Sequence, residues 1–208
     1  MPMPSVARDA LIRLREGNRR FVAHESIASP LLTPAQRMAL TNGQEPFAIV
    51  LGCSDSRVPA ELVFDQGFGD LFVIRVAGNI VAPSQVGSVE FAAARFGTRL
   101  VVVMGHSQCG AVTAAVEEVL GRATNESRNL RSIVDRVRPS VETVVAAHAN
   151  RDIDTLISEA VRANVRASAD QLRHGSQLLE GLIQRDGLRV VGAEYSLDSG
   201  VVTFFDEI

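Results

Sequence analysis

Short, continuous apolar runs recur along the chain and are separated by longer stretches with helical periodicity. The apolar runs are rich in β-branched residues and occupy residues 47–52, 71–76, 100–105 and 189–195. Because they are continuous rather than alternating, they are typical of strands that are buried on both faces of a parallel sheet. They predict four strands in the core of the protein.

The segments between these runs carry apolar residues at helical spacing. We predict helices over residues 84–97, 107–121, 152–173 and 176–187. Strands that alternate with helices are typical of folds in which the helices connect parallel strands. The predicted fold class is therefore α/β, with a mainly parallel central sheet and flanking helices.

The two ends of the chain depart from this alternation. The first 43 residues resemble a helical N-terminal arm, and residues 194–205 resemble a hairpin with its turn at 198–200. No linker, internal repeat or low-complexity block interrupts the sequence. We therefore predict a single domain over residues 1–208, in which the arm precedes an α/β core at 44–208.

Composition narrows the classes of function. The chain is 46% hydrophobic and 22% charged with a formal net charge of −3, which is typical of a globular protein. It lacks the basic excess of nucleic-acid-binding proteins and any apolar stretch long enough to cross a membrane. Its start lacks the apolar run of a signal peptide. We expect a cytoplasmic protein that acts on a small molecule, with no nucleic-acid or membrane partner.

Chemically active side chains gather at the carboxyl ends of two predicted strands. Cys53 and Asp55 follow the first strand, and His106 and Cys109 follow the third. Ligands collect at this edge of parallel sheets, so these side chains face each other if the two strands are neighbours. Two thiolates and one imidazole suit tetrahedral zinc and leave its fourth position open. The sequence thus predicts a zinc site at Cys53, His106 and Cys109.

Other interpretations of these residues stay open at this point. Free cysteines pack as small hydrophobes, so Cys53 alone fits an inert buried thiol, and a lone His106 fits a structural histidine. The chain's two cysteines could also form one disulfide with each other. Arg57 is two residues from Asp55 and could hold its carboxylate by a bidentate bond. The alternative is a turn-capping aspartate beside a surface arginine.

Two motifs resemble the β-class carbonic anhydrases. They are CSDSRV at 53–58 and GHSQCGAV at 105–112, and the resemblance continues through 69–79, 88–97 and 192–200. It implies an α/β fold that assembles as a homodimer or homotetramer with one Zn²⁺ per subunit. It further implies the reversible hydration of carbon dioxide to bicarbonate, by attack of zinc-bound hydroxide on carbon dioxide.

The resemblance also implies a role for each residue of the motifs. Cys53, His106 and Cys109 match the zinc ligands of the family, and Asp55 and Arg57 match its catalytic pair. In that pair the aspartate accepts a hydrogen bond from the zinc-bound oxygen, and the arginine keeps the aspartate ionised.

A substrate pocket is implied as well. Its positions match Gln44, Phe72, Ala77, Phe91 and Gly110, and Gln44 lies nine residues before the first cysteine, as in the plant-like type with an open site. In the family part of this wall comes from the partner subunit, so a monomer is expected to be poorly active.

A second type within the family is regulated by bicarbonate. In that type the aspartate that Asp55 matches closes onto zinc as a fourth ligand, and bicarbonate binds a tryptophan, an arginine and a tyrosine. Arg75 and Tyr195 match two of these residues, but Val50 stands where the tryptophan would be. We therefore predict the open type. One departure is RVAGN at 75–79, which replaces the commoner arginine-asparagine-valine/alanine-alanine-asparagine pattern.

Three other functions are compatible with the same residues. One is a hydrolase of carbonyl sulfide or carbon disulfide that uses the same site, and another is a zinc-binding protein without turnover. The third is a thiol-redox protein, which needs Cys53 as nucleophile and Cys109 as its resolving partner, although the chain has no C-x-x-C motif.

Overall fold

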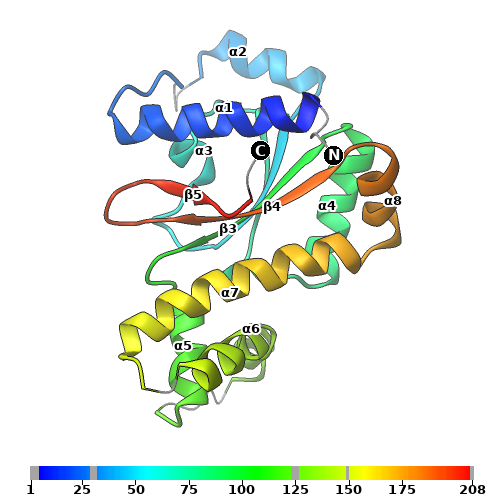
Figure 1. Cartoon of the computed structure of the whole chain (residues 1–208). Helices are drawn as coiled ribbons and strands as arrows, with labels where there is room; N and C mark the ends of the chain where they lie inside the picture. Colours follow the sequence, from blue (N-terminus) through cyan, green and yellow to red (C-terminus); the bar gives the residue numbers. More distant parts are fainter. Residues whose placement is uncertain (1–4, 29–31, 123–126, 149, 207–208) are drawn as a thin grey trace.

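A five-stranded sheet forms the centre of the protein, in the strand order β2-β1-β3-β4-β5 (Figure 1). The computed structural model describes residues 5–28, 32–122, 127–148 and 150–206. The strands are β1 (Ala48–Gly52), β2 (Leu71–Arg75), β3 (Leu100–His106), β4 (Arg189–Tyr195) and β5 (Val202–Phe204). The first four are parallel, and β5 pairs antiparallel with β4. The predicted α/β fold with a mainly parallel sheet is confirmed.

The continuous apolar runs mark the middle of this sheet. Every residue of β1 and of β3 is buried, because helices cover both faces of these central strands. One face packs beneath α1 and α3, and the other packs against α4, α7 and α8. The predicted hairpin is present, since Ser196 donates to the carbonyl of Val201 at 2.9 Å across the turn before β5.

Four helices match the predicted ones with small shifts at their ends. They are α4 (Pro83–Arg95), α5 (Gly110–Val119), α7 (Ile153–His174) and α8 (Gln177–Arg185). The largest shift is at α5, which was predicted from residue 107 but begins at Gly110. Residues 107–109 form a turn in which Gln108 has a positive φ of 57°, so they cannot continue a right-handed helix.

One long helix was missed by the sequence analysis. Helix α6 (Arg128–Ala147) begins at an N-cap, Ser127, and buries valines at helical spacing. Pro139 lies inside it, and proline inside a periodic stretch normally argues against a helix. The spacing of the valines was the available signal. Helix α6 packs against α5 in a buried cluster that includes Cys53.

The N-terminal arm consists of α1 (Ser5–Val22), α2 (Pro34–Ala39) and the 3₁₀ turn η1 (Leu40–Asn42). Helix α1 lies close to α3 (Ala60–Val63): a side chain on Gly17 would place its Cβ 1.8 Å from the carbonyl oxygen of Phe64. The Asn18 amide also donates to the carbonyl of Val63 at 3.1 Å. Helix α1 is therefore packed onto the core, whereas α2 and η1 have no buried residues. Within the described residues, none of the helices combines the length and apolar content needed to cross a membrane.

Candidate metal centre

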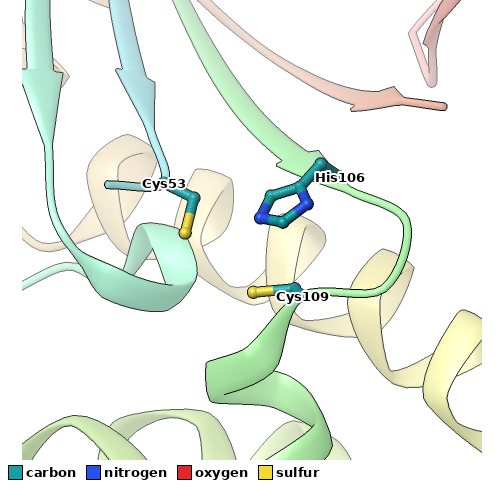
Figure 2. A group of neighbouring side chains, drawn as sticks. All are labelled: Cys53, His106 and Cys109. Atoms are coloured by element: carbon teal, nitrogen blue, oxygen red, sulfur yellow. The ribbon is translucent and has the colours of Figure 1, made fainter. Parts of the chain in front are cut away.

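Cys53, His106 and Cys109 converge at the carboxyl edge of the sheet (Figure 2). Cys53 directly follows β1, His106 is the last residue of β3, and Cys109 is the N-cap of α5. Strands β1 and β3 are neighbours, as the predicted site requires. The ligand atoms of the three side chains all lie within 4.8 Å of one another, and all three residues are buried. Both cysteines are free thiols, so the disulfide is not formed.

The turn between His106 and Cys109 brings the second cysteine back toward the histidine. The Ser107 amide donates to the carbonyl of Tyr195 at 3.0 Å, and the Ser107 hydroxyl accepts from the Leu197 amide at 2.9 Å. The turn is thereby tied to the β4–β5 hairpin. Gln108 then reverses the chain through its left-handed backbone, and Cys109 opens α5.

The two nitrogens of the His106 imidazole differ in their surroundings. Nδ1 lies 2.9 Å from the carbonyl oxygen of Ser107, whereas the buried Nε2 has no hydrogen-bond partner among the residues that the structure describes. A buried nitrogen without a partner is costly. Histidines that ligate metals commonly donate their other ring N–H to a backbone carbonyl. Nε2 therefore has the setting of a metal ligand.

The pKa values of the two thiols are shifted in opposite directions. The pKa of Cys53 is lowered, first because the Cys109 thiol donates a hydrogen bond to it. The pKa of Cys109 is raised by that same hydrogen bond, by burial and by the charge on Cys53. A divalent cation between the sulfurs allows both to ionise. The donor set of this centre therefore fits a metal ion that prefers sulfur and nitrogen ligands.

The predicted bidentate pair stands beside this centre. Arg57 donates to Asp55 through Nε at 2.9 Å and through Nη2 at 2.7 Å. The guanidinium of Arg57 holds the pKa of the Asp55 carboxyl well below its usual range. Asp55 Oδ2 lies 3.9 Å from His106 Nε2, so an ionised carboxylate borders the position that a metal would take.

Arg75 fixes the loop that carries these residues. Its guanidinium donates to the carbonyl of Cys53 at 2.9 Å and to the carbonyl of Asp55 at 2.5 Å. Sequence reasoning noted Arg75 only as a match to a regulatory site. Its position at the carboxyl end of β2, beside the end of β1, was the available signal.

The residues predicted to bind substrate fall into two groups. Ala77 lies in the 3₁₀ turn η2 (Ala77–Asn79), next to the Gly78 amide that contacts Cys53 Sγ, and Gly110 directly follows Cys109. Gln44 is exposed before the amino end of β1, at the opposite edge of the sheet.

Phe72 and Phe91 lie apart from the centre in a cluster of aromatic rings. Phe72 is paired with Ile49 near the amino end of β1. Its ring lies 6.3 Å from that of Phe91 and 6.0 Å from that of Phe96. Phe91 is 55% exposed. A single chain therefore does not bring Gln44, Phe72 and Phe91 to its own metal centre.

Comparison with known proteins places this geometry in a family. The family model for carbonic anhydrase matches residues 48–202, which include the Cys–His–Cys group and the Asp55–Arg57 pair. The chain belongs to the carbonic anhydrase family. It is 37% identical over 195 residues to carbonic anhydrase 2 of Mycobacterium tuberculosis, covering 94% of this chain and 91% of that protein.

Solved structures identify the β class of the family. The β-carbonic anhydrase CafA of Aspergillus fumigatus is 25% identical, with a TM-score of 0.75 over 96% of this chain and 90% of that one. A β-carbonic anhydrase of Sordaria macrospora, described as tetrameric, is 25% identical with a TM-score of 0.72 over 84% of this chain and 88% of that one. The chain is thus a β-carbonic anhydrase in fold and in sequence.

Proposed function

We propose that this carbonic anhydrase hydrates carbon dioxide reversibly to bicarbonate with a zinc ion held by Cys53, His106 and Cys109. The observation that carries the proposal is the buried Cys–His–Cys group, in which no group of the described part of the chain forms a hydrogen bond with His106 Nε2. Zinc prefers tetrahedral sets of sulfur and nitrogen, and three protein ligands leave one position for chemistry. Hydrolysis of carbonyl sulfide and zinc binding without turnover are not favoured, because the matched family and relatives are carbonic anhydrases.

The residues around the centre divide the remaining work. When bound, zinc supplies a Lewis acid that brings the pKa of a water molecule from about 15.7 to about 7. Asp55 accepts a hydrogen bond and thereby orients the group that donates it. Arg57 fixes the carboxylate of Asp55 through two parallel hydrogen bonds. The carboxyl of Asp55, whose pKa Arg57 lowers further below its ordinary value, is ionised at neutral pH. Its oxygens therefore do not retain the released proton.

The position of Asp55 supports the open type of site. Its carboxylate is engaged by the Arg57 side chain and backbone amide, rather than gathered with the three metal ligands. The second bicarbonate site has little support, since Val50 is fully buried in β1 and Nε and Nη2 of Arg75 donate to two backbone carbonyls. We infer that bicarbonate does not drive Asp55 onto the metal as a fourth ligand in this enzyme.

Stopped-flow hydration of carbon dioxide by the zinc-loaded protein, from about pH 6.5 to pH 9, tests the activity and the open type together. We expect a rate that rises with one ionisation near neutrality, within about one unit of pH 7. Metal-free protein prepared with a chelator is the control and is expected to be inactive. A rate that is negligible below about pH 8 and then climbs steeply would contradict the open type. Zinc-loaded protein without activity at any pH would contradict the function.

We further propose that the active form is a homodimer or homotetramer in which Gln44, Phe72 and Phe91 serve the partner's centre. The support is their distance from the centre in their own chain and the exposed ring of Phe91. The Sordaria macrospora relative is described as tetrameric. Symmetric pairing supplies each centre with residues of the other copy.

A complementation experiment tests this sharing. Gln44→Ala chains are expected to keep zinc and to lose activity roughly tenfold, as for one lost hydrogen bond to substrate. Cys109→Ser chains have no working centre. Mixed dimers of the two carry one complete centre if Gln44 acts across the interface, so a random equimolar mixture regains about a quarter of the wild-type activity. If Gln44 acts within its own chain, mixing restores nothing, and the proposal fails.

A further inference from the structure

A buried amide on a distant helix is connected to the metal centre through one glycine. Asn164 lies on α7 and is 2% exposed. Its Nδ2 donates to the carbonyl oxygen of Gly78 at 2.8 Å, 86 residues away in the chain. The N–H of the same Gly78 donates to Cys53 Sγ at 3.4 Å. Gly78 thus accepts a hydrogen bond from Asn164 and donates another to the metal ligand Cys53.

Two hydrogen bonds hold the turn at Gly78: the Asn79 N–H donates to the carbonyl of Val76 at 3.0 Å, and Asn164 donates to the carbonyl of Gly78 at 2.8 Å. Gly78 has φ 69° and ψ 17°, a left-handed conformation, and Asn79 follows it with φ 44°. Glycine reaches many conformations at little cost, so its peptide groups need external anchors to keep one direction. A side chain at this position would place its Cβ 3.1 Å from the Cβ of Ala111 on α5. The site therefore combines a glycine with an anchor on α7.

Asn164 is unusual for its place in the helix. Asparagine is a poor helix former, and its neighbours along the buried face of α7 include Val161 and Val165. A buried amide among apolar side chains is tolerated when it is hydrogen-bonded, and its bond to Gly78 meets that need. Nothing in the local sequence requires an asparagine here.

We propose that Asn164 is a positioning residue for the metal centre. By holding the Gly78 carbonyl, it aims the Gly78 N–H at Cys53 Sγ and so fixes the direction and the donor strength of that sulfur. The inference rests on the proposed metal centre and extends it to a helix outside both sequence motifs. Hydrogen-bond partners of metal ligands commonly change metal affinity or activity by 10- to 100-fold when they are replaced, and Asn164 acts on one such partner, Gly78.

Cobalt-substituted protein offers a readout at the sulfur itself. Hydrogen bonds to a thiolate lower the energy of its lone pairs, so losing one shifts the sulfur-to-cobalt charge-transfer band to longer wavelength. For Asn164→Leu, which keeps a similar volume without the donor, we expect such a shift. We also expect the metal to pass to a chelator about tenfold faster than in the wild type.

Ser168→Ala is the matched control. Ser168 is also buried on α7 and donates to the carbonyl of the next residue, Asn79, at 3.1 Å. The backbone N–H of Asn79 donates to the carbonyl of Val76 at 3.0 Å rather than to sulfur. The control removes a hydrogen bond between the same helix and the same segment, so we expect its cobalt band to stay in place.

The outcomes separate this inference from the proposed function. A wild-type protein without a sulfur-to-cobalt band would overturn the metal centre and the inference with it. A normal wild-type band that Asn164→Leu leaves unchanged, or that Ser168→Ala shifts equally, would overturn the inference alone. If Asn164→Leu does not fold, the cadmium-113 form of the wild type decides. Scalar coupling between the Gly78 amide proton and the metal supports the link through Cys53, and its absence overturns it.

Discussion

Replacing Cys109 by serine is expected to remove the bound metal and to lower carbon dioxide hydration by a factor on the order of 10³ or more. A serine hydroxyl stays protonated in the neutral range where a metal-bound thiol ionises, so it is a poor zinc ligand at a buried site. Cys109 is 1% exposed, and water has little access to take its place. Metal content by mass spectrometry and stopped-flow hydration at about pH 8 measure the two losses.

The control for this variant is Ala115→Ser, which adds a hydroxyl to the same helix. Ala115 is fully buried on α5 and does not belong to the Cys–His–Cys group. We expect it to keep zinc and most of the activity, since a helical serine can bond the carbonyl one turn back. A Cys109→Ser protein with one zinc per chain and wild-type rates would refute the assignment of the ligands.

The second large effect is expected at Asp55. Asp55→Asn should keep the metal and lower kcat/KM by about 10²- to 10³-fold, which is typical for the loss of one preorganised hydrogen-bonding group at a reacting centre. The asparagine side chain has no charge for Arg57 to hold and can turn its NH₂ group toward the centre. Stopped-flow rates together with metal analysis distinguish this loss from loss of zinc.

Arg57→Met is expected to act through Asp55. The Arg57 guanidinium is the largest cause of the lowered pKa of Asp55. Without it, the pKa of Asp55 returns toward the ordinary value of an aspartate, near 3.9. The sign of this change is upward, yet Asp55 stays ionised above about pH 5. The expected loss, about tenfold or more, is therefore one of orientation and is constant from pH 6.5 to pH 9.

The double variant Asp55→Asn/Arg57→Met tests whether the two side chains work as a unit. If Arg57 serves only to hold Asp55, the double variant loses no more activity than Asp55→Asn alone, because coupled residues are not additive. Additive losses would show that Arg57 contacts substrate independently. The Arg57 side chain is 50% exposed, so a direct contact between its guanidinium and substrate is sterically open to it.

Local sequence patterns predicted most of the fold. The four apolar runs are strands of the sheet, because burial on both faces favours apolar side chains throughout β1 and along β3 up to His106 at its end. Helix α6 escaped prediction for an equally local reason. Its interior Pro139 obscures a pattern that tertiary packing sustains, as Val134, Val137 and Val141 are buried against α5 and α7.

The candidate site likewise has parts that local sequence predicts and parts that depend on tertiary packing. Each motif is a short segment at a strand end, so residue types and spacing were enough to predict Cys53, His106 and Cys109 as a metal set. The bond between Asp55 and Arg57 spans two residues and needs only a turn. The geometry inside each motif follows from the sequence because it is set within a few residues.

Only the tertiary structure decided which parts of the chain meet. Strand β3 lies beside β1 although β2 comes between them in sequence, and this order brings the two motifs to one place. It also buried His106 Nε2 with no hydrogen-bond partner within the described ranges, and it placed Arg75 against the loop of Cys53. Asn164 reaches Gly78 across 86 residues. No local pattern encodes such contacts, because they depend on how helices and strands pack after each has formed.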